Sequence, residues 1–169
     1  MGYFDSGYLI GDACLMGVGA TSYHFGVLSS SMHTAWVRYT CGRIKSDFRY
    51  SAGIVYNNFP WPKEPSDKQM KVIETAVQAV LDIRAQFPKA SLADLYDPDT
   101  MPSALVKAHQ ALDRAVDAAY VSDGGKRKWG SDAERVAFLF RRYRELTSLL
   151  PGEEPGSRSR VFRRRGSGG

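Results

Sequence analysis

Helical periodicity dominates the second half of the chain. After Ser66, which forms a capping box with the glutamine three residues on, apolar residues recur every three or four positions, which predicts a long helix. A single helical turn is expected over residues 91–96. Two longer helices should follow it, the first capped by Thr100 and the second beginning with a capping box of Ser131 and Glu134. The stripes are Met70, Ile73, Val77 and Val80; Leu105, Ala108, Leu112, Ala115, Val116 and Ala119; and Val136, Leu139, Phe140, Tyr143 and Leu146. Because each helix has one apolar face, we expect them to pack together as a bundle.

The first 62 residues have a more mixed pattern. Residues 8–10 and 13–18 are typical of two short strands, and the β-branched and aromatic run at 54–56 predicts a third. Between them a helical stripe predicts one helix over residues 22–40, ended by Gly42 in the left-handed C-cap conformation. The stripe is made of Phe25, Leu28, Met32, Ala35, Trp36 and Tyr39.

These patterns predict an α+β fold in two parts. A small mixed N-terminal part, residues 1–62, is expected to pack on a C-terminal helical bundle, residues 63–151. The remaining residues, 152–169, hold Glu, Gly, Ser and Arg with almost nothing to bury, so we expect a disordered basic tail.

The composition is that of an ordinary globular protein. Of 169 residues, 43% are hydrophobic and 24% charged, no apolar run approaches the roughly 20 residues of a membrane span, and no signal peptide is visible, so a cytoplasmic location is expected. Cys14 and Cys41 are then expected to be free thiols. The net charge of +5 lies mainly in the tail, which carries five Arg and two Glu, so bulk charge alone does not establish nucleic-acid binding.

Motifs for catalysis are weak. The glycine-rich stretch 17–20 is a poor candidate for a cofactor loop, because such short patterns are common and no acidic residue follows at the right distance. The sequence Asn-Phe-Pro-Trp at 58–61 partly resembles the Asn-Pro-Pro-aromatic motif of amino-methyltransferases. Phe59 replaces the first proline, so packing of Phe59 and Trp61 on a rigid turn is the favoured interpretation.

Metal sites are not predicted either. The three histidines, His24, His33 and His109, are scattered, and no Cys/His cluster has zinc spacing. Asp94, Asp97 and Asp99 resemble a fragment of a calcium loop, but the remaining ligands are missing, and these residues suit helix caps and turns better.

The most suggestive segment for binding is the polar, basic stretch that follows Gly42. Its cations can neutralise phosphate or bind guanine edges, and its hydroxyls can hydrogen-bond to phosphate oxygens. The candidate DNA-binding residues are Arg43, Lys45, Ser46, Arg49, Tyr50 and Ser51. The alternative is a solvated loop, which is the usual role of a charged run.

Longer blocks of sequence resemble one family. Residues 24–62, HFGVLSSSMHTAWVRYTCGRIKSDFRYSAGIVYNNFPWP, are very similar to the end of the target-recognition domain of MmeI-type DNA methyltransferases. Two further blocks resemble the C-terminal helical domain of that family: SLADLYDPDTMPSALVKAHQALDRAVDAAY at 91–120 and SDAERVAFLFRRYRELT at 131–147. The loop 126–128 and the Arg-rich tail resemble no motif of the family.

The resemblance implies a parent enzyme of the restriction-modification type that methylates adenine N6 with S-adenosylmethionine. This chain contains no counterpart of the family's catalytic or methyl-donor motifs, so no catalytic residue and no cofactor are expected in it. Its expected partners are double-stranded DNA, which it would bind and position, and an upstream methyltransferase domain of the same polypeptide. The alternative is a stand-alone helical module from a truncated gene that binds another protein.

Overall fold

The fold is mostly helical, with one short hairpin. The computed structural model describes residues 2, 15, 17–44 and 47–148, and the strands expected at 8–10 and 13–18 lie mainly outside these residues, as does the expected tail. The helices are α1 (Ser22–Ser29), α2 (Ser31–Thr40), η1 (Ala52–Tyr56), α3 (Asp67–Ala85), α4 (Leu92–Leu95), α5 (Ser103–Ala119), η2 (Val121–Asp123) and α6 (Asp132–Thr147). The strands are β1 (Gly42–Ile44) and β2 (Asp47–Arg49), so α+β overstates the sheet content.

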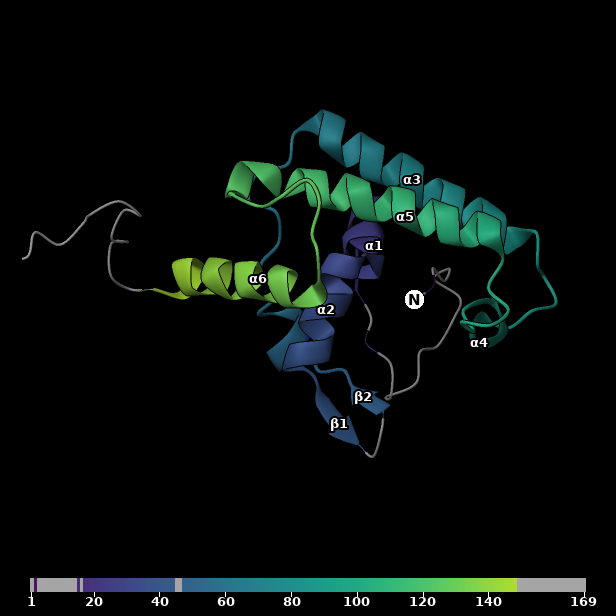
Figure 1. The fold of residues 1–169 in the computed structure, drawn as a ribbon, viewed down its shortest axis with the longest axis horizontal. Coiled ribbons are helices and arrows are strands. Elements are labelled where there is room, and N and C mark those ends of the chain that lie inside the picture. Colours follow the sequence, from purple (N-terminus) through teal and green to yellow (C-terminus); the bar gives the residue numbers. More distant parts are fainter. Residues whose placement is uncertain (1, 3–14, 16, 45–46, 149–169) are drawn as a thin grey trace, which may run out of the picture.

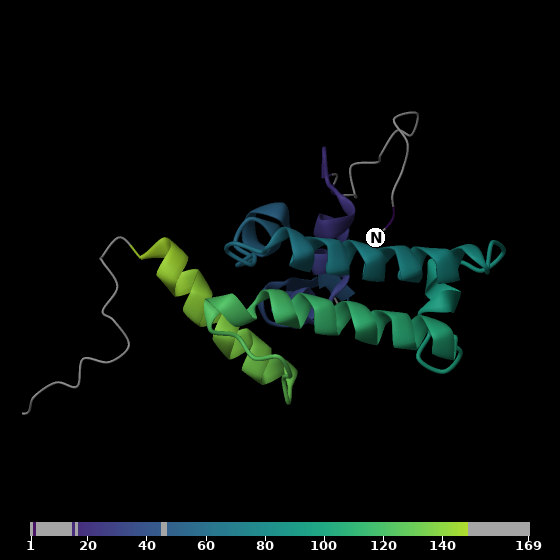
Figure 2. The same ribbon diagram turned by 90° about the horizontal axis from the view of Figure 1, so that it is seen from above.

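Two long antiparallel helices, α3 and α5, form one layer of the molecule (Figures 1 and 2). Their predicted stripes are buried: Ile73, Val77 and Val80 on α3, and Leu105, Leu112, Val116 and Ala119 on α5. Helix α1 crosses this pair so closely that Gly26 lies against the side chains of Ile73 and Val77. The N-terminal helices therefore share one hydrophobic core with the C-terminal bundle.

The single helix expected over residues 22–40 is two helices. Ser30 adopts an extended conformation between α1 and α2, with φ −81° and ψ 162°. Its hydroxyl donates to the Val27 carbonyl at 2.7 Å and accepts from the His33 amide, so it closes one helix and caps the next. The apolar stripe continues across the break, so periodicity alone does not reveal it.

The end of α2 was predicted at the right place but not with the right geometry. Cys41 is an extended C-cap whose amide bonds to the Val37 carbonyl, and Gly42 begins β1 instead of taking a left-handed conformation. The segment after it is an antiparallel hairpin rather than an irregular loop, with Gly42 opposite Arg49 and Arg43 opposite Phe48.

The strand predicted at 54–56 is wrong, because these residues belong to the π-helical turn η1. Tertiary contacts override their β-propensity. The indole nitrogen of Trp36 donates to the Val55 carbonyl at 3.0 Å, and the Asn58 amide donates to the carbonyls of Gly53 and Ile54.

Several helix ends agree with expectation and others do not. The capping box of Ser66 is present, whereas Thr100 does not cap α5, whose N-cap is Pro102. Ser131 caps α6, but the carboxylate of Glu134 binds Lys126 instead of completing the box. On α6 the predicted Phe140 and Leu146 are exposed, and Phe138 and Arg142 are buried in their place.

Among the described residues, no helix is long and apolar enough to cross a membrane. The same part of the chain contains no group of three or more metal-binding side chains. Asp94 is the N3 residue of the capping box of α4, in which its carboxylate accepts from the amide of the N-cap Ser91, and Asp97 accepts from the amide of Asp99, which confirms the cap-and-turn interpretation.

Candidate nucleic-acid interface

The β1–β2 hairpin extends from the molecule at the end opposite α3 and α5 (Figure 1). It continues directly from α2, so its first strand follows a helix whose inner face is buried. Of the predicted binding residues, Arg43 lies in β1 opposite Phe48 in β2, and Arg49 lies at the end of β2. Lys45 and Ser46, which connect the strands in sequence, lie outside the described residues.

Three of the predicted residues are consecutive along the return of the hairpin. Arg49 and Tyr50 are exposed, and with Ser51 they border a shallow hollow of about 380 Å³ beside η1. Ser51 is also structural, because its hydroxyl accepts from the amide of Ile54 and caps η1. Arg49 is therefore the member of this trio whose polar side-chain atoms are most available to a ligand.

Tyr50 is held in place by a buried histidine that sequence reasoning missed. The Nε2 atom of His33 lies 2.9 Å from the Tyr50 hydroxyl, and the edge of the imidazole meets the Phe59 ring with centroids 4.6 Å apart. His33 is 2% exposed, and burial lowers its pKa to about 4, so the ring is neutral near pH 7. Burial likewise raises the pKa of Tyr50 to about 12, which keeps its hydroxyl protonated.

Aromatic side chains pack around Phe59 beside helix α2. Phe59 is 3% exposed, which confirms it as a packing residue, and it meets Trp36 and Trp61 edge-on at centroid distances of 6.3 and 5.5 Å. Trp61 is partly buried against the core and also contacts His24. The Asn-Phe-Pro-Trp segment thus packs on the core beside Trp36 and His33, in agreement with its packing interpretation.

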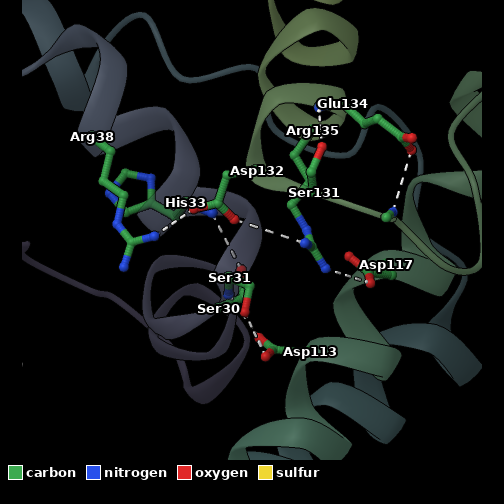
Figure 3. Close-up of polar contacts among 11 residues, drawn as sticks. Ser30, Ser31, His33, Arg38, Asp113, Asp117, Ser131, Asp132, Glu134 and Arg135 are labelled. Carbon is green, nitrogen blue, oxygen red and sulfur yellow. Dashed lines mark hydrogen bonds and ion pairs between the residues drawn. The ribbon is translucent and has the colours of Figure 1, made fainter. Parts of the chain in front are cut away.

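Polar contacts connect the hairpin-bearing helix α2 to the C-terminal helices (Figure 3). The amide and hydroxyl of Ser31, at the start of α2, donate to the two carboxylate oxygens of Asp113 on α5 at 2.7 and 2.6 Å. At the other end of α2, Arg38 forms an ion pair with Asp132, the first residue of α6. Helix α2 is therefore fixed at both ends to the bundle.

A second ion pair joins α5 to α6 beside these contacts. Arg135 lies 3.2 Å from Asp117, and both side chains are largely buried, at 13% and 7% exposed. Burial raises the pKa of Asp117 to about 6, although the Arg135 guanidinium acts in the opposite direction. Asp113 and His33 could not be recognised from the sequence, because their partners lie 82 and 17 residues away.

Two family models together match most of this chain. The family model described as "MmeI, target recognition domain" matches residues 1–63, and that described as "MmeI, C-terminal domain" matches residues 65–151. DNA methyltransferase A of Bacillus subtilis (strain 168) is 43% identical over 128 residues, which are 76% of this chain but 14% of that protein.

A solved structure is similar in both sequence and shape. The Type IIL restriction-modification enzyme MmeI, determined in complex with DNA, is 51% identical to this chain with a TM-score of 0.71. The match covers 78% of this chain and 17% of the MmeI chain. This chain thus spans less than a fifth of the length of either relative.

Proposed function

We propose that this chain, which belongs to the MmeI family of DNA methyltransferases, binds and positions duplex DNA for a methyltransferase domain of the same polypeptide. Within that family it corresponds to the target recognition and C-terminal domains. The observation that carries this proposal is the hairpin, which extends from the bundle with basic residues in both strands. A rigid support matters, because contacts that set the register of a duplex must not move relative to the catalytic centre.

The contacts at the hairpin would divide by chemistry. Arg43, Lys45 and Arg49 would neutralise phosphates, and an arginine among them could also bind guanine through two parallel hydrogen bonds. The hydroxyls of Ser46, Tyr50 and Ser51 would bond to phosphate oxygens. For adenine methylation the target base must leave the duplex, and this chain would hold the flanking DNA while that happens.

The chemistry itself would be performed elsewhere in the parent enzyme, with S-adenosylmethionine as methyl donor. The glycine-rich stretch 17–20 does not suit that cofactor: Val18 is 87% exposed, and a side chain on Gly19 would meet no atom within 4 Å. The amide of Thr21, where α1 begins, is already occupied by the His24 ring at 3.2 Å. No catalytic step is therefore assigned to the described residues.

The test compares two triple variants of the full chain that lose the same charge. One changes Arg43, Lys45 and Arg49 to Ala; the control changes Lys68, Lys71 and Lys89, three exposed lysines on or after α3, to Ala. Binding to labelled duplex is measured by fluorescence anisotropy at several salt concentrations. The slope of log affinity against log salt should fall by about 0.9 for each phosphate that the variant no longer neutralises.

The hairpin variant should therefore bind more weakly, with a flatter salt dependence, than the control variant. If the two variants bind duplex with equal affinity and equal slope, the hairpin is a solvated surface and the proposed function fails.

A further inference from the structure

A second basic surface lies on the C-terminal helices, and none of its residues belongs to the hairpin. It is a recess of about 510 Å³ between α5, the loop before α6 and the first turn of α6. Arg114 of α5 and Arg127, Lys128 and Trp129 of the loop line it. Arg127 and Lys128 belong to the loop 126–128, which resembles no motif of the family.

The loop is anchored on both sides of Arg127 and Lys128. On one side Lys126 forms an ion pair with Glu134 at 2.9 Å. On the other side Trp129 is 8% exposed and packs against Phe138, with ring centroids 5.1 Å apart. Such anchoring lowers the entropy that a ligand would otherwise have to remove from the loop on binding.

The acids that line the recess are already engaged. Asp117 is paired with Arg135, and Asp113 accepts two hydrogen bonds from Ser31. Both carboxylates keep their negative charge, but the recess is lined by four cationic side chains, Arg114, Arg127, Lys128 and Arg135, against these two acids. Among the described residues, the buried Nε atom of Arg135, the indole nitrogen of Trp129 and the Oδ1 atom of Asp117 have no hydrogen-bond partner.

Three cations of the recess remain exposed: Arg114, Arg127 and Lys128. Within the part of the chain that the structure describes, no acidic side chain lies within ion-pair distance of any of them. The recess thus has an excess of exposed positive charge, which is the chemistry that recognises phosphate groups.

We propose that Arg114, Arg127 and Lys128 form a second contact to the backbone of the same DNA duplex, by binding its phosphodiester groups. This inference rests on the proposed function. The polar contacts of Figure 3 fix the position of the recess relative to the hairpin. Asp113 lines the recess and also binds Ser31 at the start of α2, the helix that leads to the hairpin. A duplex held at two fixed points would be restrained in both position and direction.

The test is a third triple variant, in which Arg114, Arg127 and Lys128 become Ala, compared with the Lys68, Lys71 and Lys89 control. All three side chains are exposed, so the melting temperature should match that of the control. Affinity should fall by the same factor for different duplex sequences, since phosphates carry no sequence information, and the salt slope should fall by about 0.9 for each phosphate released.

Equal affinity and salt slope in the recess variant and the control would overturn the inference. The proposed function is judged separately by the hairpin variant. If the hairpin variant loses binding and the recess variant does not, the recess proposal fails and the function stands. If the recess variant loses binding and the hairpin variant does not, the recess contact holds and the assignment to the hairpin fails.

Discussion

Replacing Gly26 with alanine tests how closely the N-terminal helices are joined to the bundle. A Cβ atom at this position would lie 2.6 Å from Cγ2 of Ile73 and 2.8 Å from Cγ2 of Val77. Both neighbours are β-branched and have little rotamer freedom in a helix, so the backbones of α1 and α3 must move apart. The matched control is Gly53→Ala in η1, where an added Cβ would meet no atom within 4 Å.

Two opposing effects set the size of the change. Alanine favours a helix interior over glycine by about 0.8–1.0 kcal/mol. Overpacking a filled core costs about 1–3 kcal/mol, and the upper end applies here because the contacts are far below van der Waals distance and the neighbours are stiff. The Gly26→Ala variant should therefore lose roughly 1–2 kcal/mol of unfolding free energy. The control, which gains the helix preference of alanine without a clash, should equal wild type or be more stable by up to about 1 kcal/mol.

Urea unfolding followed by circular dichroism measures these differences, with thermal melting as a second measure. For a chain of this size each kcal/mol lowers the melting temperature by roughly 2–4 °C. A Gly26→Ala variant as stable as Gly53→Ala would show that α1 does not pack directly on α3, and the single shared core would have to be abandoned.

Two further predictions concern protonation and catalysis. The pKa of His33 is about 4 in the folded chain and 6.5 when unperturbed. As the pH falls below 6.5, the unfolded chain therefore takes up a proton that the folded chain does not. The free energy of unfolding should fall as a result, by about 2 kcal/mol between pH 6.5 and 5. The raised pKa of Asp117 has the opposite effect on stability over pH 4 to 6, so wild type must be compared with a variant that lacks only the histidine. In melting curves, His33→Gln should lose less stability than wild type on acidification. Equal losses would contradict the lowered pKa of His33. The chain alone should also transfer no methyl group from tritiated S-adenosylmethionine to duplex DNA, and protein-dependent label in the DNA would refute this.

Local sequence patterns predicted those parts of the fold that local physics determines. The stripes of α3 and α5 were correct because an amphipathic helix must bury its apolar face. The Ser66 and Ser131 caps were correct for a similar reason, since a serine there satisfies an amide that the helix leaves free.

The predictions that were wrong concern residues whose structure is determined by contacts with residues distant in the sequence. Val55 has strong β-propensity, yet the bond from Trp36 to its carbonyl fixes a helical turn. Phe140 continues a regular stripe, but it lies at the rim of the bundle, where its ring meets Trp36 at 5.1 Å and stays 41% exposed. For the same reason the residue types of the basic segment after Gly42 were enough to predict a binding site, whereas the contact of His33 with Tyr50 could not be predicted.

Photo-crosslinking from the hairpin tests most directly whether this surface meets DNA. The photoreactive residue p-benzoylphenylalanine is placed at Phe48 in β2 or, as a control, at Phe87 after α3; the two side chains are 43% and 38% exposed. After irradiation with labelled duplex at low salt, the chain substituted at Phe48 should carry crosslinked DNA and the chain substituted at Phe87 should not. Equal crosslinking from both positions, or crosslinking from Phe87 alone, would contradict a DNA-binding role for the hairpin.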